Sequence, residues 1–73
     1  MRVGKLVALN QYGGIIEDRM GELFKFDIKG SLGPLSTSID VVFEIAYETN
    51  WAYDVESATR SFMNFVEKFG TPK

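Results

Sequence analysis

Few side chains in this sequence could carry out acid–base or covalent chemistry. The chain has no histidine and no cysteine, which removes imidazole bases, thiol nucleophiles and the usual zinc ligands. The carboxylates Glu17 and Asp18 are adjacent near the end of an expected strand, and strand neighbours point to opposite faces, so the two do not converge as an acid–base pair. Gly13-Gly14 lacks the downstream Gly-Lys-Ser/Thr of a phosphate loop. We therefore expect no enzyme activity, no metal and no cofactor.

The chemistry that remains is that of charges and aromatic rings, and the charges are unevenly distributed. The chain carries 8 Lys and Arg against 10 Asp and Glu, a net charge of −2, so it has no general attraction for nucleic acid. Residues 30–59 contain no Lys or Arg and hold five carboxylates, on Asp40, Glu44, Glu48, Asp54 and Glu56. One part of the domain should be acidic, through the solvated outer faces of its strands and loops.

The length of 73 residues indicates one small domain, which buries only about 60% of its unfolded surface. No apolar segment approaches the roughly 20 residues that cross a bilayer, and the N-terminal residues lack the apolar region of a secretion signal. We expect a soluble cytoplasmic protein without a membrane partner.

Five short strands should position the charges and rings. Val3–Asn10 is rich in aliphatic residues and stops at a turn cluster in which Gly13 and Gly14 can take positive φ. The other strands are expected at residues 15–18, 22–28, 39–47 and 51–56. Residues 30–38, rich in Gly, Pro and Ser, form the long connecting loop. Five strands in this order fit a small OB-type barrel, whose closure hides the strand edges.

The last two strands carry four of the ten aromatic residues. A period of two places Val41, Phe43, Ile45 and Tyr47 on one face of the fourth strand, and Trp51, Tyr53 and Val55 on one face of the fifth. Inward positions of small barrels are filled by side chains. We therefore interpret Phe43, Tyr47, Trp51 and Tyr53 as the core or mouth of the barrel.

A helix is expected after residue 57, where Ser57 and Thr59 offer capping hydroxyls. An apolar stripe follows at positions i, i+3, i+4 and i+7, made by Phe62, Phe65, Val66 and Phe69. Gly70 suits the residue after the helix. Residues 1–56 then form the barrel, and residues 57–73 form the helix and tail of the same domain. A helix of this length is marginal alone, so its stripe needs a surface to cover.

Several segments resemble a cold-shock domain over about residues 2–56. Gly4–Asn10 is similar to the family's opening Gly-Lys strand ending in Asn, and Gly13–Asp18 to its Gly-rich turn and following strand. Leu23-Phe24-Lys25-Phe26 is similar to its third strand, and segments 40–45 and 52–55 to its fourth and fifth. The resemblance implies an all-β fold, a five-stranded antiparallel OB-type barrel, here with one added C-terminal α-helix.

The resemblance also implies binding of single-stranded nucleic acid by base stacking on exposed aromatic residues, each stack being worth about 1–3 kcal/mol. The aligned positions have changed. Val7 and Ala8 occupy the places of an exposed Lys and Trp, and the Gly-Phe-Gly-Phe-Ile-Glu element is shortened, with Ile15 in an aromatic position. Tyr12, in the turn, is the residue that could substitute.

The register of the third strand is decided by Lys25. Matching the family directly would turn Phe24 and Phe26 outward and bury an unpaired ammonium, which costs on the order of several kcal/mol or more. A shift of one residue exchanges the two faces. We favour the shifted register, with Phe24, Phe26 and Ile28 inside and Lys25, Asp27 and Lys29 outside.

We expect a weak binder of single-stranded RNA or DNA. Its site residues would be Lys5, Tyr12, Lys25 and Lys29. The alternative is a protein-interaction or dimerisation module that keeps the barrel and has lost nucleic-acid binding. The changed stacking positions, the acidic charge and the added helix support this alternative.

The expected barrel and helix each have an uncovered apolar surface. Val7, Ala8 and Ile15 would form an apolar strip where the family carries a cation and aromatic rings. We expect the strip to be covered, within one chain or across a homodimer, by the helix residues Phe62, Phe65, Val66 and Phe69.

Overall fold

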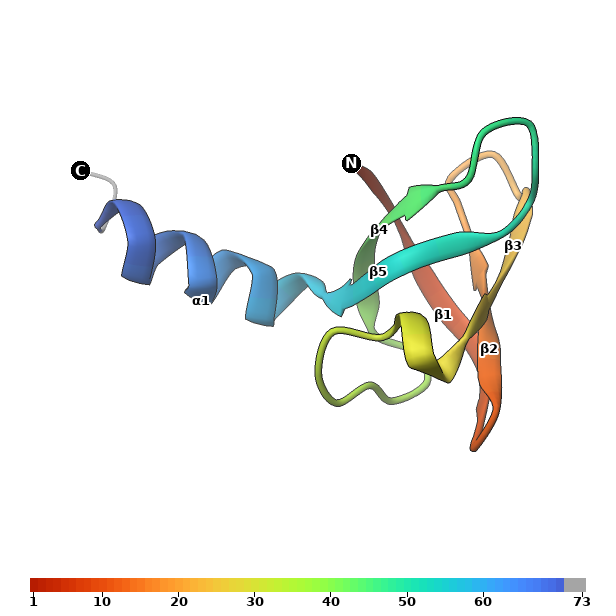
Figure 1. The fold of residues 1–73 in the computed structure, drawn as a ribbon, viewed down its shortest axis with the longest axis horizontal. Helices are drawn as coiled ribbons and strands as arrows, with labels where there is room; N and C mark the ends of the chain where they lie inside the picture. Colours follow the sequence, from red (N-terminus) through yellow and green to blue (C-terminus); the bar gives the residue numbers. More distant parts are fainter. Residues whose placement is uncertain (71–73) are drawn as a thin grey trace.

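The computed structural model describes residues 1–70, apart from the side chain of Phe69; the packing expected of Phe69 lies outside the described residues. The elements are β1 (Arg2–Asn10), β2 (Gly13–Glu17), β3 (Leu23–Asp27), the 3-10 turn η1 (Ile28–Gly30), β4 (Asp40–Ile45), β5 (Ala52–Ser57) and α1 (Ala58–Phe69) (Figure 1). The strands form one sheet in the order β3-β2-β1-β4-β5, and neighbouring strands are antiparallel. The expected five-stranded antiparallel sheet with one C-terminal helix is confirmed.

The outer strands of this sheet, β3 and β5, approach each other at isolated points. The Lys25 N–H donates to the Asn50 carbonyl at 2.9 Å, and Lys25 and Trp51 form a parallel bridge. Beyond the end of β3, the Leu32 N–H donates to the Val55 carbonyl at 2.7 Å. These are single bridges, so within residues 1–70 the ladder stays open between β3 and β5.

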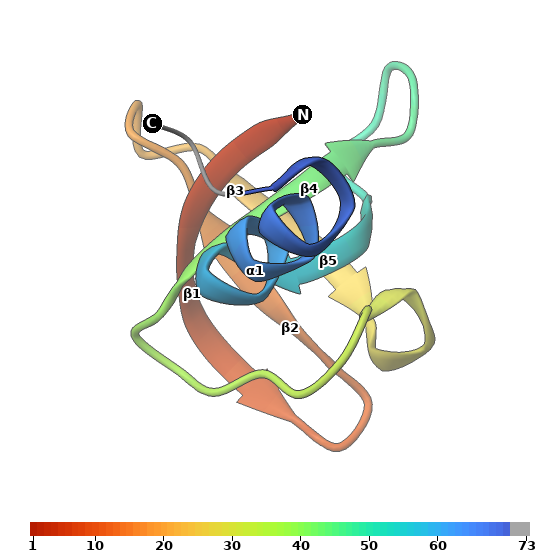
Figure 2. The ribbon, with the colours of Figure 1, turned by 90° about the vertical axis from the view of Figure 1, so that its left-hand side faces the viewer.

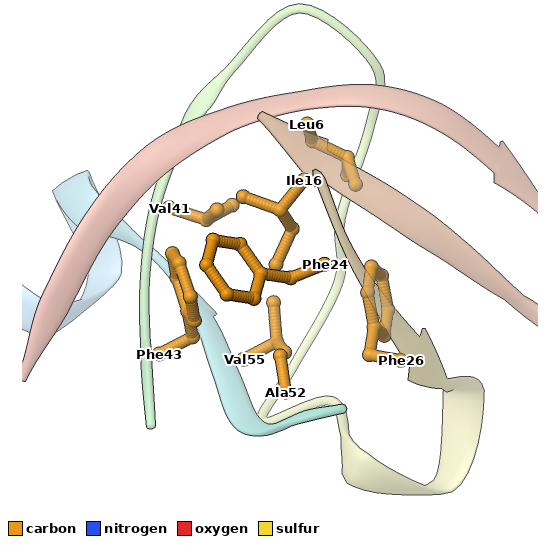
Figure 3. Packing of buried hydrophobic residues seen from close by; sticks show 8 residues of the cluster. All are labelled: Leu6, Ile16, Phe24, Phe26, Val41, Phe43, Ala52 and Val55. Atoms are coloured by element: carbon orange, nitrogen blue, oxygen red, sulfur yellow. The ribbon is translucent and has the colours of Figure 1, made fainter. Parts of the chain in front are cut away.

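The hydrophobic core lies inside the curve of the sheet (Figure 3). It consists of Leu6, Ile16, Phe24, Phe26, Val41, Phe43, Ala52 and Val55. The Phe24 ring packs at 5.5 Å from Phe43 with a tilt of 49°, an arrangement that aromatic pairs favour. Phe24 and Phe26 are 2% and 3% exposed, while Lys25 is exposed. The shifted register of the third strand is confirmed.

Ile28 departs from that register and is exposed. The strand ends at Asp27, whose carboxylate accepts a hydrogen bond from the Lys29 N–H at 2.8 Å and caps η1. This turn leaves the alternation of the strand, so the expectation that Ile28 lies inside is wrong.

Gly13 and Gly14 are not turn residues with positive φ, as the sequence suggested. They are the first residues of β2, and the turn is made by Gln11 and Tyr12. A Cβ on Gly13 would collide with the Phe26 carbonyl oxygen on β3. Glycine is required here because β3 lies so close, which is a second common use of the residue in strands.

The inward face of β5 differs from the expected one. Ala52 and Val55 are buried, whereas Trp51 and Tyr53 are 51% and 46% exposed. The cause is Asp54, which has a φ of 52° and lies where the β4–β5 register shifts. A bulge of this kind changes which side chains face inward. The sequence predicts Trp51 and Tyr53 in the core or mouth of the barrel, and a place in the core is wrong for both.

The two aromatic residues of the fourth predicted strand, Phe43 and Tyr47, differ in burial. Phe43 is 1% exposed, which confirms its place in the core, but Tyr47 is 87% exposed. The strand stops at Ile45, and Tyr47 and Glu48 belong to the turn that follows, with a φ of 58° at Glu48. Tyr47 is therefore wrongly predicted as a core or mouth residue.

The helix begins where β5 ends. Ser57 is the last residue of β5 and also the N-cap of α1, and its hydroxyl accepts from the Arg60 N–H at 3.0 Å. Gly70, with a φ of 84°, ends the helix and donates to the Val66 carbonyl at 2.8 Å. The expected helix and its caps are confirmed.

No helix within residues 1–70 is both long enough and apolar enough to cross a bilayer.

The direction of α1 is not the expected one. The helix continues outward from β5 (Figure 1) and makes its main contacts with β4 and β5, which lie behind it in the end-on view of Figure 2. It does not cover Val7, Ala8 and Ile15. The prediction that the helix packs on this strip within one chain is therefore wrong. The helix starts directly at the end of β5, so it extends beyond the sheet and does not fold back over β1 and β2.

Candidate functional site

A row of four residues crosses the outer face of the sheet. Ala8 on β1 pairs with Ile15 on β2, Ile15 pairs with Lys25 on β3, and Lys25 bridges to Trp51, the residue just before β5. Side chains of directly paired residues share a face of the sheet and lie close together. The row therefore joins a small apolar surface, a cation and an indole ring.

A shallow depression of about 340 Å³ lies along this row. Its lining consists of Ala8, Leu9, Asn10, Tyr12, Gly13, Gly14, Ile15, Lys25, Phe26 and Trp51. Lys25 is the charged residue among them. The depression thus combines two exposed aromatic side chains, on Tyr12 and Trp51, with one positive charge and an apolar floor.

A bulge in β1 creates part of that floor. The β1–β2 register shifts between Leu6 and Ala8, which makes Val7 the extra residue. Leu6 is fully buried, yet Ala8, two positions later, is exposed. Regular alternation would turn both inward, so the bulge is what brings Ala8 to the outer face beside Ile15. Val7 is 45% exposed and lies outside the depression.

The turn before β5 holds Trp51 in place. The Thr49 hydroxyl donates to the Ala46 carbonyl at 2.8 Å and accepts from the Trp51 N–H at 3.1 Å. The Asn50 side-chain amide donates to the Leu23 carbonyl at 3.0 Å, which fastens the turn to β3. Trp51 is thus held next to Lys25 by backbone and side-chain bonds rather than by burial of its ring.

Tyr12 is held by the neighbouring turn. Its N–H donates to the Asn10 carboxamide oxygen at 2.8 Å, and its carbonyl accepts from the Ile28 N–H at 2.8 Å. The side chain is 73% exposed. The backbone of Tyr12 is therefore fixed while its ring remains available at the rim of the depression.

The structure brings together two of the four predicted site residues, Tyr12 and Lys25. Lys5 pairs with Glu17 on β2 and with Asp40 on β4, so it lies between two carboxylates and away from the depression. Lys29 is in η1 and does not line the depression either. Neither Lys5 nor Lys29 belongs to the surface that Tyr12 and Lys25 share.

Of the two adjacent carboxylates, Glu17 and Asp18, it is Asp18 that makes structural contacts at the β2–β3 turn. Asp18 accepts from the Met20 and Glu22 N–H groups, both at 2.9 Å, and its other oxygen lies 3.7 Å from the Arg2 guanidinium. That guanidinium also lies 5.2 Å from the Phe24 ring centroid. Asp18 thus fixes the β2–β3 turn and one end of the core.

Sequence reasoning missed Trp51, which completes the site. The feature that could have indicated it is Asp54, because Asp is one of the few non-glycine residues that adopt positive φ and so mark a bulge. Comparison of the chain with protein-family models and with curated proteins gives no match.

Proposed function

We propose that the protein binds single-stranded RNA or DNA on the depression formed by Tyr12, Lys25 and Trp51. The observation that carries the proposal is the adjacency of Trp51 and Lys25 on one exposed face. Single strands bind proteins by stacking bases on aromatic rings beside cations that attract phosphate. Trp51 supplies a ring that the changed positions in β1 and β2 no longer provide.

The fold that supports this site is proposed to be an OB-type barrel of the partly open kind. The bridges of Lys25 to Trp51 and of Ser31 to Val55 support closure between β3 and β5. A barrel of this type would keep the outer faces of β1, β2 and β3 on one continuous surface. The resemblance to a cold-shock domain points to the same architecture.

Binding is expected to be weak. Among residues 1–70, Lys25 is the only charged residue in the lining of the depression, and the whole chain carries a net charge of −2. Counterion release, which dominates nucleic-acid affinity, scales with the number of phosphates neutralised. Stacking on Tyr12 and Trp51 must therefore provide most of the affinity.

The test uses the intrinsic fluorescence of the protein. Trp51 is the single tryptophan of the chain, so quenching of its emission reports a base at the proposed site. We expect oligo-dT or oligo-U to quench it, duplex DNA of the same length to have little effect, and higher salt to weaken the effect slightly. An emission spectrum unchanged by any single strand, at concentrations well above micromolar, contradicts the proposal.

A second function, as a protein-interaction module, is favoured by one separate observation. Phe62 and Met63 on α1 are 58% and 54% exposed. Adjacent large apolar side chains on a projecting helix are typical of a surface that binds another protein.

A further inference from the structure

We propose that Asn10 determines which bases the depression accepts. Bases that carry a carbonyl group at the edge it contacts, namely uracil, thymine and guanine, are favoured over adenine and cytosine, which carry an amino group in the same place. This inference rests on the proposed function and adds a base preference to it. It starts from the side-chain amide of Asn10, an exposed residue in the lining of the depression.

Two hydrogen bonds fix the orientation of this amide. The Asn10 Oδ1 atom accepts from the Tyr12 N–H at 2.8 Å and from the Gly13 N–H at 3.1 Å. Both donors are backbone N–H groups, so the atom that they meet must be the oxygen, and the Nδ2 group must lie on the other side of the carboxamide. The β1–β2 turn therefore holds the side chain in one orientation.

The Nδ2 group of Asn10 is a donor without a partner within residues 1–70. Asparagine commonly reads adenine by using both ends of its amide, the oxygen on N6–H₂ and the nitrogen on N7. Asn10 cannot do so, because the two lone pairs of its oxygen are already taken by the turn. A base at this position meets a donor alone.

The other polar side chains of the depression have a similar character. The Lys25 ammonium and the Trp51 indole N–H donate and cannot accept, whereas the Tyr12 hydroxyl can do either. The part of the lining that lies in residues 1–70 contains no carboxylate. The amino group of a bound base would thus find few side-chain acceptors in exchange for water, while a carbonyl oxygen would find several donors.

Asn10 also lies beside the ring on which a base would stack. Its oxygen binds the Tyr12 N–H, so the ring and the amide come from the same turn and line the same depression. A base stacked on Tyr12 then has its edge near the Asn10 amide. At that edge thymine and uracil carry O4 and guanine carries O6, whereas cytosine carries N4–H₂ and adenine N6–H₂.

Uracil and cytosine form the matched pair for the test, because they have the same size and differ at this position in a carbonyl or an amino group. We expect oligo-deoxyuridine to bind about twofold to tenfold more tightly than oligo-deoxycytidine at neutral pH, the range that one hydrogen bond provides. Fluorescence anisotropy of labelled oligomers measures the two dissociation constants at one salt concentration.

Asn10→Asp tests the role of the amide without removing the turn. An aspartate can accept the same two N–H groups, but it places an acceptor where Nδ2 was. The preference for uracil should disappear or reverse. Gln11→Glu is the control, since it adds the same charge to an exposed position of the same turn, outside the lining. It should weaken binding of both oligomers equally and keep their ratio. Thermal melting checks that both variants stay folded.

The outcomes separate this inference from the proposed function. Equal affinity of the parent for the two oligomers overturns the base preference and leaves single-strand binding intact, as does an Asn10→Asp variant that keeps the parent's ratio. A ratio that falls as much in Gln11→Glu overturns it too, because charge rather than the amide would then set the preference. A parent chain that binds neither oligomer overturns the proposed function together with this inference.

Discussion

Lys25 and Trp51 are neighbours across the gap between β3 and β5. Lys25 is on β3, the strand at one edge of the sheet, and Trp51 directly precedes β5, the strand at the other edge. The Lys25 N–H bonds to the Asn50 carbonyl, which places the next residue, Trp51, in a parallel bridge with Lys25. The contact links a cation that the sequence identifies as exposed with a ring that the sequence assigns to the core or mouth of the barrel. Most of the expected binding behaviour depends on this pair.

Replacing Trp51 by alanine should reduce affinity for single strands by about fivefold to 150-fold, the range that corresponds to losing one base stack. Because the ring is half exposed, the thermal melting temperature should change little. Fluorescence anisotropy of a labelled oligomer measures the affinity, since the variant has no tryptophan.

Tyr47→Ala is the control for this change. Tyr47 is an exposed aromatic residue of the same turn region, but it does not line the depression. Affinity should stay at the parent value. Equal losses in the two variants would argue against a specific role for Trp51.

Lys25→Gln should make binding less sensitive to salt. Each phosphate contact to a single strand contributes about 0.7 to the slope of log K against log salt, so the slope should fall by about that amount. Lys5→Gln removes the same charge from the same face of the sheet, between Glu17 and Asp40. The slope for Lys5→Gln should match that of the parent. A decrease as large as that of Lys25→Gln would indicate that the phosphate contact lies at Lys5 as well.

Phe24→Ala should destabilise the fold strongly. The ring lies in the middle of the core, against Phe43 (Figure 3), and loss of a buried Phe costs about 3–5 kcal/mol out of the roughly 5–15 kcal/mol that hold a domain folded. Chemical denaturation measures the difference. The neighbouring Leu23 is 51% exposed, and Leu23→Ala should cost clearly less; comparable losses would contradict the register of β3.

Two substitutions of Asp54 test the bulge that exposes Trp51 and Tyr53. Asp54→Val should destabilise the protein by about 1–2 kcal/mol, because a β-branched residue is strained at positive φ. Asp54→Gly should be tolerated, since glycine adopts this conformation without a steric penalty. Thermal melts of the two variants give the comparison, and a valine variant as stable as the glycine variant would mean that the position does not require positive φ.

Much of the fold follows from local patterns in the sequence. Lys25 fixes the register of β3, because burying its ammonium would cost more than any alternative, and Phe24 and Phe26 then fall in the core. Ser57 and Gly70 mark the ends of α1 by capping chemistry that needs no knowledge of the rest of the chain.

The errors arise where one residue interrupts a regular period. The sequence shows Trp51, Tyr53 and Val55 in perfect alternation, and nothing in that alternation reveals that Asp54 takes positive φ. Val7 in β1 has the same effect on Ala8. The direction of α1 was also beyond prediction from its stripe, because amphipathic spacing indicates that a face should be covered but does not identify the surface that covers it.

The join between β5 and α1 has a mechanical consequence. Strand and helix share Ser57, and the sequence from Val55 to Phe69 contains neither glycine nor proline, the residues that most often allow a sharp bend. The molecule measures 36 × 24 × 20 Å, which is elongated for its size, and should tumble anisotropically in solution. A helix that follows its strand without such a residue between them is expected to keep a nearly constant direction relative to the sheet.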